Sequence, residues 1–396
     1  MPKHKLLKTD FKFFSLDPLF EQCPKDKFYY YLIIGERSNG KSFSIQEYAL
    51  REYLEHGTQL AHVRRWDTDW EGNTTKIWEM FVTNPYRGNI VKELSKGKWN
   101  DVLYYRGAWY LAKRAEKPLE DPVSGKPIEV GEIIDKDPKP FSYRFCVNLE
   151  EHYKGTSYPN IGIIFFDEFI TRGYYLKNEF IMFMSLVSTL VRLENKTRIF
   201  MVANTISTAC PYFTEMGIRR IKQMQPGQTD IYEYGDSDLK VAVHYCENDD
   251  KRKTKKKSNS YFAFENPSLK MVTSGGWEID IYPHLPSGFE YTKKDILYFY
   301  FIQYQDEIFH CELIYKKDIE SLITYIHKKT TPIKEDNRQL VFTPEYDMRP
   351  WYSRRITKPT NNLHRLILNQ FVQEKVYYQD NEIGESVRHY LDWCMT

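Results

Sequence analysis

The chain has 396 residues, of which 41% are hydrophobic and 28% are charged, and this composition excludes a disordered, fibrous or collagen-like protein. Its length predicts two domains or slightly more, and its longest apolar runs have the length of a strand, far below the roughly 20 residues that span a membrane. Because 56 basic residues nearly balance 54 acidic ones, for a net charge of +2, any surface that binds a polyanion has to come from a local cluster.

The N-terminal residues are basic but lack the apolar core and the cleavage site of a signal peptide, so we expect a cytoplasmic protein. The six cysteines lie far apart in the sequence, and none has the Cys-x-x-Cys spacing of zinc and redox sites. We therefore expect reduced cysteines that pack as small hydrophobic residues.

The first predicted element is a buried strand over residues 28–34, an aromatic and aliphatic run. A glycine-containing loop over 35–42 follows, then a helix over 42–55 with apolar residues at helical spacing, and then a second strand over 59–64. This order favours a β-α-β unit, whose natural result is a parallel sheet.

Residues 66–150 mix tryptophans with turn residues, which predicts an insertion of short strands and surface loops. A near-continuous apolar strand follows over 161–166, then a helix over 178–194 and another apolar strand over 198–203. We interpret residues 1–225 as one α/β domain.

The composition changes after about residue 206. Residues 226–275 contain Pro, Gly, Asp and a basic run, Lys-Arg-Lys-Thr-Lys-Lys-Lys, and are predicted to be a linker or a small connecting subdomain. Residues 276–396 are predicted to form a smaller α+β domain. Its expected elements are a hairpin of strands 296–303 and 307–315, and helices over 317–327, 362–377 and 385–394.

The loop after the first strand has the sequence Gly-Glu-Arg-Ser-Asn-Gly-Lys-Ser, which matches Gly-x-x-x-x-Gly-Lys-Ser. Its glycines let the backbone N–H groups surround phosphates, and the following helix adds its positive end. We expect Lys41 to bridge the β and γ phosphates of ATP, and Ser42 to bind Mg²⁺. The residues expected to contact the nucleotide in this region are Gly35, Arg37, Asn39, Gly40, Lys41, Ser42 and Phe43. For Arg37 the alternative is an ordinary arginine of an exposed loop.

Polar residues follow the two apolar strands. Asp167 is expected to hold the magnesium opposite Ser42, and Glu168 is the candidate base for the attacking water. Asn204, after the next strand, could hold that water or sense the γ-phosphate. The alternatives are a solvated helix start for the acidic pair and a turn cap for Asn204. The carboxyl ends of parallel strands meet at one edge of a sheet, so we expect these residues to form one site.

Four arginines are further candidates. Arg64 and Arg65 end the second strand, and one of the pair is expected to reach the nucleotide. Arg192, or alternatively Arg198, could enter the site of a neighbouring subunit in a ring and stabilise charge in the transition state.

Together these segments resemble one family, the DNA-packaging motor ATPases of phi29-like podophages. The resemblance rests on residues 33–42, His62-Val-Arg-Arg, Ile163-Ile-Phe-Phe-Asp-Glu-Phe-Ile, Arg192, Ala203-Asn204 and Pro211-Tyr-Phe. It covers about the first 215 residues and is faint beyond them.

The resemblance implies a RecA-like P-loop ATPase domain of the ASCE class with a parallel central sheet. It also implies a C-terminal domain like a degenerate ribonuclease H-type nuclease. Members form a ring, typically of five subunits, that docks on the portal of a procapsid in the host cytoplasm and threads double-stranded DNA into it. In that comparison Lys41, Ser42, Asp167 and Glu168 are the catalytic and metal residues, Arg192 is the finger acting in trans, and Asn204 couples hydrolysis to movement.

The C-terminal domain is expected to be inactive as a nuclease, because such an enzyme needs acidic residues in mid-strand to hold two metals. Residues 296–303 have none, and Glu312 with Asp392 makes an incomplete set. The basic run at 251–257 either touches DNA phosphates or is a solvated linker. A helicase or AAA+ remodeller, a nucleotide-gated structural adaptor and a small-molecule kinase remain alternatives for the whole chain.

Overall fold

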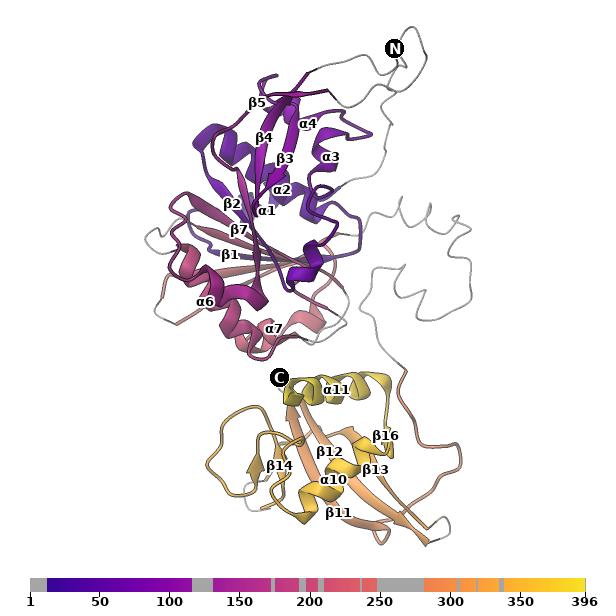
Figure 1. The fold of residues 1–396 in the computed structure, drawn as a ribbon. Helices are drawn as coiled ribbons and strands as arrows, with labels where there is room; N and C mark the ends of the chain where they lie inside the picture. Colours follow the sequence, from indigo (N-terminus) through magenta and orange to yellow (C-terminus); the bar gives the residue numbers. More distant parts are fainter. Residues whose placement is uncertain are drawn as a thin grey trace. The chain divides into compact units, whose positions relative to one another are not determined.

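The structure is a computed structural model. It describes residues 13–115, 131–171, 175–191, 197–205, 210–235, 237–247, 281–304, 307–317, 320–334 and 338–395. The chain divides into two compact units (Figure 1). Of the described residues, the first unit contains those up to 170, 179–205 and 224–247, and the second contains 171, 175–178, 210–223 and those from 281 onward.

Within the described part of the first unit, ten strands form a single mixed sheet. They are β1 (Tyr30–Gly35), β2 (Gln59–Arg64), β3 (Asp101–Tyr105), β4 (Ala108–Arg114), β5 (Ile133–Lys136), β6 (Ser142–Cys146), β7 (Ile161–Asp167), β8 (Arg198–Asn204), β9 (Thr229–Glu233) and β10 (Lys240–Tyr245). Their order is β3-β4-β6-β2-β7-β8-β1-β10-β9, and β5 pairs with β4. The strands from β6 to β10 in this order are parallel, while β4 and β9 are antiparallel to their neighbours.

Helices cover both faces of this sheet. They are α1 (Asp17–Gln22), α2 (Lys41–His56), α3 (Glu79–Val82), α4 (Ile90–Leu94), α5 (Glu150–Tyr153) and α6 (Glu179–Val191), with short 3₁₀ helices η1 (Asp67–Trp70) and η2 (Val147–Leu149). Phe165 of β7 belongs to the core that contains Ile45 of α2. Its neighbour Phe166 packs against Phe183 of α6, with ring centroids 4.9 Å apart. Because successive strand residues point to opposite faces, α2 and α6 lie on opposite faces of the sheet.

The predicted elements around the glycine loop are confirmed. The strand over 59–64 has the bounds of β2, and the strands predicted over 28–34, 161–166 and 198–203 correspond to β1, β7 and β8 within two residues. The helix predicted over 42–55 is α2. The α/β class and the parallel arrangement of β1 and β2 in one sheet agree with the β-α-β interpretation.

The described parts of the segment 66–150, residues 66–115 and 131–150, form the predicted short strands, but these strands belong to the main sheet and not to a separate insertion. Its strands β3, β4 and β6 extend the sheet beyond β2. Four of its tryptophans, Trp70, Trp78, Trp99 and Trp109, are at most 3% exposed and build the core on the α2 face. Burying rings of this size requires a continuous apolar layer, which the extended sheet supplies.

The prediction of a linker or connecting subdomain over 226–275 does not hold for residues 229–233 and 240–245, which form β9 and β10 of the main sheet. β10 pairs in parallel with β1 along Tyr30–Ile34, and Val241, Ala242 and Val243 are fully buried. The apolar run is short, so its sequence gives little indication of a central strand. The basic run at 251–257 lies outside the described residues.

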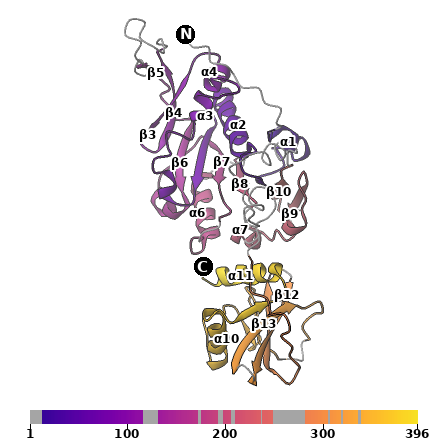
Figure 2. The ribbon, with the colours of Figure 1, turned by 90° about the vertical axis from the view of Figure 1, so that its right-hand side faces the viewer.

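The second unit contains a smaller six-stranded mixed sheet in the order β15-β14-β11-β12-β13-β16. Its described elements are β11 (Ile296–Tyr304), β12 (Glu307–Lys316), β13 (Ser321–Lys328), β14 (Val341–Phe342), β15 (Tyr352–Ser353), β16 (Val376–Tyr378), α7 (Pro211–Glu215), η3 (Ile221–Gln223), α10 (Asn362–Val372) and α11 (Asn381–Met395). Figure 2 shows β12 and β13 of this sheet with the helices α10 and α11. Ile367 of α10 and Val387 of α11 share a core with Phe309 and Cys311 of β12, so both helices cover the same face.

The predicted hairpin is confirmed, because β11 and β12 pair antiparallel from Ile296 to Tyr304. The helix predicted over 317–327 is wrong, since residues 321–328 form strand β13, antiparallel to β12. Its β-branched and aromatic side chains have hydrophobic neighbours on both faces of the sheet, which favours a strand. The helix predicted over 362–377 ends at Val372, and β16 follows it.

Two whole-chain predictions can be compared with the structure. All six cysteines are buried and free, as expected. Among the described residues, no helix is at once long enough and apolar enough to cross a membrane.

Candidate active site

The glycine loop curls between β1 and α2 around the side chain of Lys41. Gly40 has a φ of 93°, a left-handed conformation that costs glycine little, and it immediately precedes α2. The Lys41 ammonium lies 2.6 Å from the Glu36 carbonyl oxygen and 3.1 Å from the Asn39 side-chain oxygen, and the residue is 4% exposed. The loop therefore gathers oxygen atoms around a buried cation, which is where phosphate oxygens would bind.

Gly35 is required by the close approach of the next strand. A Cβ on Gly35 would lie 2.8 Å from the Cβ of Cys246 and 3.1 Å from the Asn39 side-chain nitrogen. The Cys246 amide also donates to the Ile34 carbonyl at 2.8 Å. The segment after β10 thus braces the start of the phosphate loop, and this contact excludes any larger residue at position 35.

Ser42 and Asp167 meet across the carboxyl edge of the sheet. The Ser42 hydroxyl donates to Asp167 Oδ1 at 3.1 Å. Magnesium in proteins prefers oxygen ligands, and a hydroxyl and a carboxylate beside a phosphate loop supply them. These two residues fit a magnesium ion.

The Asp167 carboxylate lies in a buried, positively charged setting. Arg64 donates to Asp167 Oδ2 at 2.7 Å, and His62 Nε2 lies 3.9 Å from the same oxygen. Burial alone would raise the pKa of Asp167, but His62, Arg64 and Ser42 together hold this pKa below its ordinary value. Burial also lowers the pKa of His62, whose ring stacks on Phe165. Asp167 is therefore held as a carboxylate.

Glu168 differs from Asp167 in both exposure and backbone. Its side chain is 61% exposed, and Arg64 donates to its Oε2 at 3.1 Å. Its φ is 61°, in the left-handed region that side chains other than glycine adopt at a cost of about 1–2 kcal/mol. Strain of this kind concentrates at functional sites. The turn directs Glu168 into solvent at the edge of the sheet, where a water molecule can reach it.

Asn204 lies directly beside the phosphate loop. It ends β8 and is the register partner of Gly35 on β1, and the Thr205 amide donates to the Gly35 carbonyl at 3.2 Å. On the other side of β8, Val202 is the register partner of Asp167. The structure thus brings the ends of β1, β7 and β8 together, as the carboxyl-edge prediction requires.

Arg65 and Phe43 have internal partners. The Arg65 guanidinium forms a buried ion pair with Glu179 at 2.8 Å and donates to the Phe169 carbonyl at 2.7 Å. Phe43 stacks on Phe81, with ring centroids 4.6 Å apart. Of the two arginines that end β2, Arg64 is the one that contacts the carboxylates of the site, and Arg65 joins the end of β2 to α6.

Arg37 and Arg192 are two other arginines predicted for this site. Arg37 is an exposed residue of the loop. Arg192 lies outside the described residues, directly after α6.

Comparison with known proteins gives an independent result for part of the chain. Residues 139–255 match the family model of the Podovirus DNA encapsidation protein (Gp16). The DNA packaging protein of Bacillus phage phi29 is 23% identical over 184 residues, which are 46% of this chain and 44% of that protein. That of Bacillus phage B103 is 22% identical over 189 residues, 47% of each chain. Over these regions the chain is similar to the DNA-packaging proteins of phi29-like phages. The aligned region spans about half the length of these curated relatives.

Solved structures of similar fold cover almost the whole chain. The structure described as the phi-28 gp11 DNA packaging motor has a TM-score of 0.52 at 18% identity and covers 96% of this chain and 98% of its own. The bacteriophage phi-29 viral genome packaging motor assembly has a TM-score of 0.50 at 17% identity, with 98% and 100% covered. At these identities the likeness concerns the fold.

Sequence reasoning missed three residues of the site. Glu179 begins α6 and resembles an ordinary acidic residue of a first helical turn, and Cys246 lies in the predicted linker. His62 lies two residues before Arg64, so the alternation of side chains along β2 places both on the same face of the sheet. The family resemblance includes His62 without giving it a role, and this spacing is the signal that places it beside Arg64.

Proposed function

We propose that this chain hydrolyses ATP and uses the reaction to translocate double-stranded DNA into a viral procapsid. The observation that carries the proposal is the 3.1 Å contact of Ser42 with Asp167 beside the buried Lys41 ammonium. It joins the two motifs of a P-loop hydrolase, which lie far apart in the sequence, into one site. The DNA-packaging part of the proposal is supported by the similarity to the DNA packaging proteins of Bacillus phages phi29 and B103.

Each residue has a distinct task in the proposed reaction. The loop N–H groups and Lys41 bind the β and γ phosphates, with the ammonium exchanging loop carbonyls for phosphate oxygens. Ser42 and Asp167 hold Mg²⁺, which would neutralise charge that develops on the phosphates. Glu168 accepts the proton of the attacking water, and Asn204 orients that water. Arg64 balances the charge of both carboxylates and holds Glu168 near the phosphate loop.

The wider assignment follows the same family. The first unit would be the RecA-like ATPase of ASCE type, and the second unit a nuclease-like domain that has lost its catalytic carboxylates. The predicted division at 225 and 276 shifts under this proposal, because β9 and β10 belong to the ATPase sheet. The protein would act as a ring, typically of five subunits, docked on the portal of a procapsid in the host cytoplasm. Arg192 would complete the site of the neighbouring subunit.

The experiment compares wild type with Glu168→Gln and with the exposed control Glu71→Gln. We expect wild type to hydrolyse ATP with stimulation by double-stranded DNA, and Glu168→Gln to lose about 10²- to 10⁴-fold in kcat, the range for a general base. ATP binding should persist in Glu168→Gln, and Glu71→Gln should behave as wild type.

Movement of DNA needs a separate measurement. Wild type should package DNA into procapsids, protecting it from a nuclease, and Glu168→Gln should not. Unchanged hydrolysis in Glu168→Gln would overturn the assignment of the base. Hydrolysis without protected DNA, accompanied by strand separation, would instead favour a helicase.

A further inference from the structure

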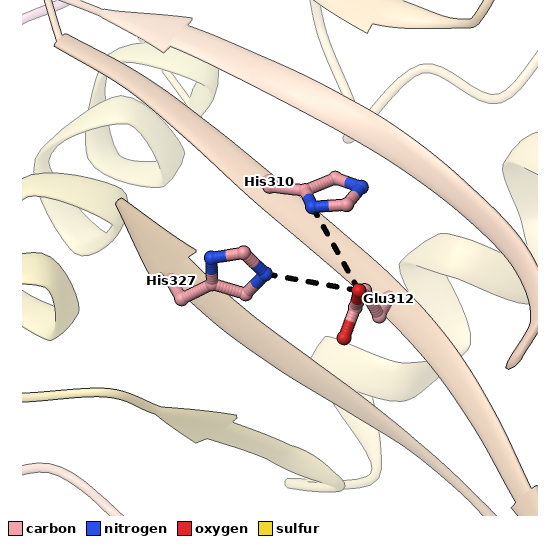
Figure 3. Close-up of side chains that lie close together, drawn as sticks. All are labelled: His310, Glu312 and His327. Atoms are coloured by element: carbon pink, nitrogen blue, oxygen red, sulfur yellow. Dashed lines mark ion pairs between the residues drawn. The ribbon is translucent and has the colours of Figure 1, made fainter. Parts of the chain in front are cut away.

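Three potential metal-binding side chains converge on one face of the second sheet. His310 and Glu312 lie two residues apart on β12 and therefore point to the same face. His327 lies on β13 as the register partner of His310. Figure 3 shows the three side chains pointing toward one another, and one donor atom from each lies within 4.8 Å of the other two. The odd-numbered residues of β12, such as Phe309 and Cys311, face the core under α10 and α11. The even-numbered His310 and Glu312 therefore lie on the sheet face turned away from those helices.

The contacts within the cluster are too long to be hydrogen bonds. His310 Nδ1 and His327 Nε2 each lie 3.8 Å from Glu312 Oε1. The other carboxylate oxygen, Oε2, accepts a hydrogen bond from the Tyr291 hydroxyl at 2.7 Å. Tyr291 therefore fixes the carboxylate so that Oε1 faces the two imidazole rings.

The second nitrogen of His327 has a carbonyl oxygen within reach, which is compatible with a proton on that nitrogen. Nδ1 lies 3.4 Å from the Lys328 carbonyl oxygen, which can only accept. With the proton on Nδ1, the Nε2 lone pair points toward Glu312. A lone pair that faces a carboxylate oxygen is unfavourable, and a cation between the two removes the repulsion. Metal-binding histidines commonly have this outer partner on the other ring nitrogen.

The surroundings shield the cluster from water. The side chain of Glu312 is 10% exposed, and those of His310 and His327 are 23% and 29% exposed. The rings of Phe299 and Phe301 pack on His310 at 5.1 and 5.3 Å. Lys329, whose charge acts on His310, directs its ammonium to the Thr331 hydroxyl at 2.5 Å. The three ligands thus lie in a largely apolar shell that favours coordination of an ion.

We propose that His310 Nδ1, Glu312 Oε1 and His327 Nε2 bind a divalent transition metal of the zinc class. Two imidazoles and one carboxylate are a ligand set of zinc sites with an open fourth position. Ligand atoms about 2.0–2.2 Å from a tetrahedral zinc lie roughly 3.3–3.6 Å apart. The two 3.8 Å separations from Glu312 need shifts of a few tenths of an ångström, and the two imidazole nitrogens, which lie within 4.8 Å of each other, need an approach of at most about 1.5 Å. Magnesium, which prefers all-oxygen ligands, is disfavoured.

The open position gives this site a chemistry of its own. It would bind a water molecule or an oxygen atom of an anion, on a sheet that has no such role in the proposed ATPase. The inference does not depend on the packaging function, because its residues belong to the second unit.

The test uses the full chain, stripped with a chelator, and titrates Zn²⁺ by calorimetry in saturating Mg²⁺. We expect wild type to bind one Zn²⁺ per chain. In His310→Gln and in Glu312→Gln the affinity for this ion should fall on the order of 100-fold or more. The exposed histidine variants His56→Gln and His152→Gln should bind as wild type. Co²⁺ should give visible ligand-field absorption in wild type that is absent from His310→Gln.

A milder variant keeps the test valid if a ligand change prevents folding. Tyr291→Phe retains all three ligands and removes the hydrogen bond that fixes the Glu312 carboxylate, so we expect a 10- to 100-fold weaker affinity for Zn²⁺. Equal Zn²⁺ stoichiometry and affinity in wild type, Glu312→Gln and Tyr291→Phe would overturn the site.

Discussion

The Ser42 hydroxyl on α2 donates to Asp167 Oδ1 on β7 at 3.1 Å, although 125 residues separate the two in the chain. The contact crosses the edge of the sheet at which β1 and β7 both end. This hydrogen bond joins the end of the phosphate loop directly to the carboxylate at the end of β7.

Removing the Ser42 hydroxyl should impair hydrolysis without unfolding the protein. A hydrogen bond to a charged group contributes about 1.5–3 kcal/mol, so Ser42→Ala should lower kcat/KM for Mg-ATP by roughly 10- to 100-fold. Ser42→Thr keeps a hydroxyl at the same position and should retain most activity. Steady-state ATPase assays over a range of Mg²⁺ concentrations check this, and equal losses in both variants would contradict the role of the hydroxyl.

The Arg65–Glu179 pair should be essential to stability. Both side chains are at most 6% exposed, and removing one leaves the other as an uncompensated buried charge, which costs about 3–5 kcal/mol. Arg65→Ala and Glu179→Gln should therefore lower the free energy of unfolding by that amount. The matched control is Arg51→Ala, which breaks the exposed Arg51–Glu47 pair and should cost at most about 1 kcal/mol. Denaturant titration followed by circular dichroism measures both, and similar losses would refute the distinction.

The backbone at Glu168 predicts opposite effects on stability and activity. With φ at 61°, replacement by glycine relieves a conformation that costs other residues about 1–2 kcal/mol. Glu168→Gly should accordingly be more stable than Glu168→Ala by about 1 kcal/mol, while both lack hydrolysis. Thermal and denaturant unfolding of the two variants decides the matter, and a less stable glycine variant would argue against strain at this turn.

Acid should destabilise the first unit through His244. This residue of β10 lies 2.9 Å from the Thr229 hydroxyl, and burial lowers its pKa to about 4, with Glu247 acting in the opposite direction. An unfolded histidine titrates near pH 6.5, so between pH 6.5 and 4 the unfolded state binds a proton that the folded state does not. Stability should fall across this window by on the order of 2–3 kcal/mol.

His244→Gln should remove that part of the pH dependence. Denaturant titrations at a neutral and an acidic pH compare it with wild type and with the exposed control His56→Gln. A wild-type slope that survives in His244→Gln would show that other groups cause the loss.

The sequence was informative wherever one short run determined one element. The Gly-x-x-x-x-Gly-Lys-Ser loop and the apolar run before Asp167 are local patterns, and parallel pairing then brings their ends to one edge. Long-range partners had no such signal. The approach of Cys246 to Gly35 depends on β10 pairing with β1, and the Arg65–Glu179 pair depends on where α6 begins.

In the second unit, one segment fits both the spacing of apolar residues in a helix and their spacing in a strand. Leu322, Ile323 and Ile326 fit a helical spacing, yet the segment pairs with β12 and buries Ile323 and Ile326 on opposite faces. Once His327 was assigned to a helix, its position opposite His310 could not be anticipated. A metal cluster formed across two strands becomes visible only when the register is known.

The burial of all six cysteines has a practical consequence for following the protein in motion. Thiol reagents attack exposed thiolates, and burial raises the pKa of Cys146 and Cys246 to about 12. A cysteine introduced on an exposed helix would then be the fast-reacting thiol of the chain. Fluorescent dyes could be attached at chosen points without first deleting the native cysteines, including the one that braces the phosphate loop.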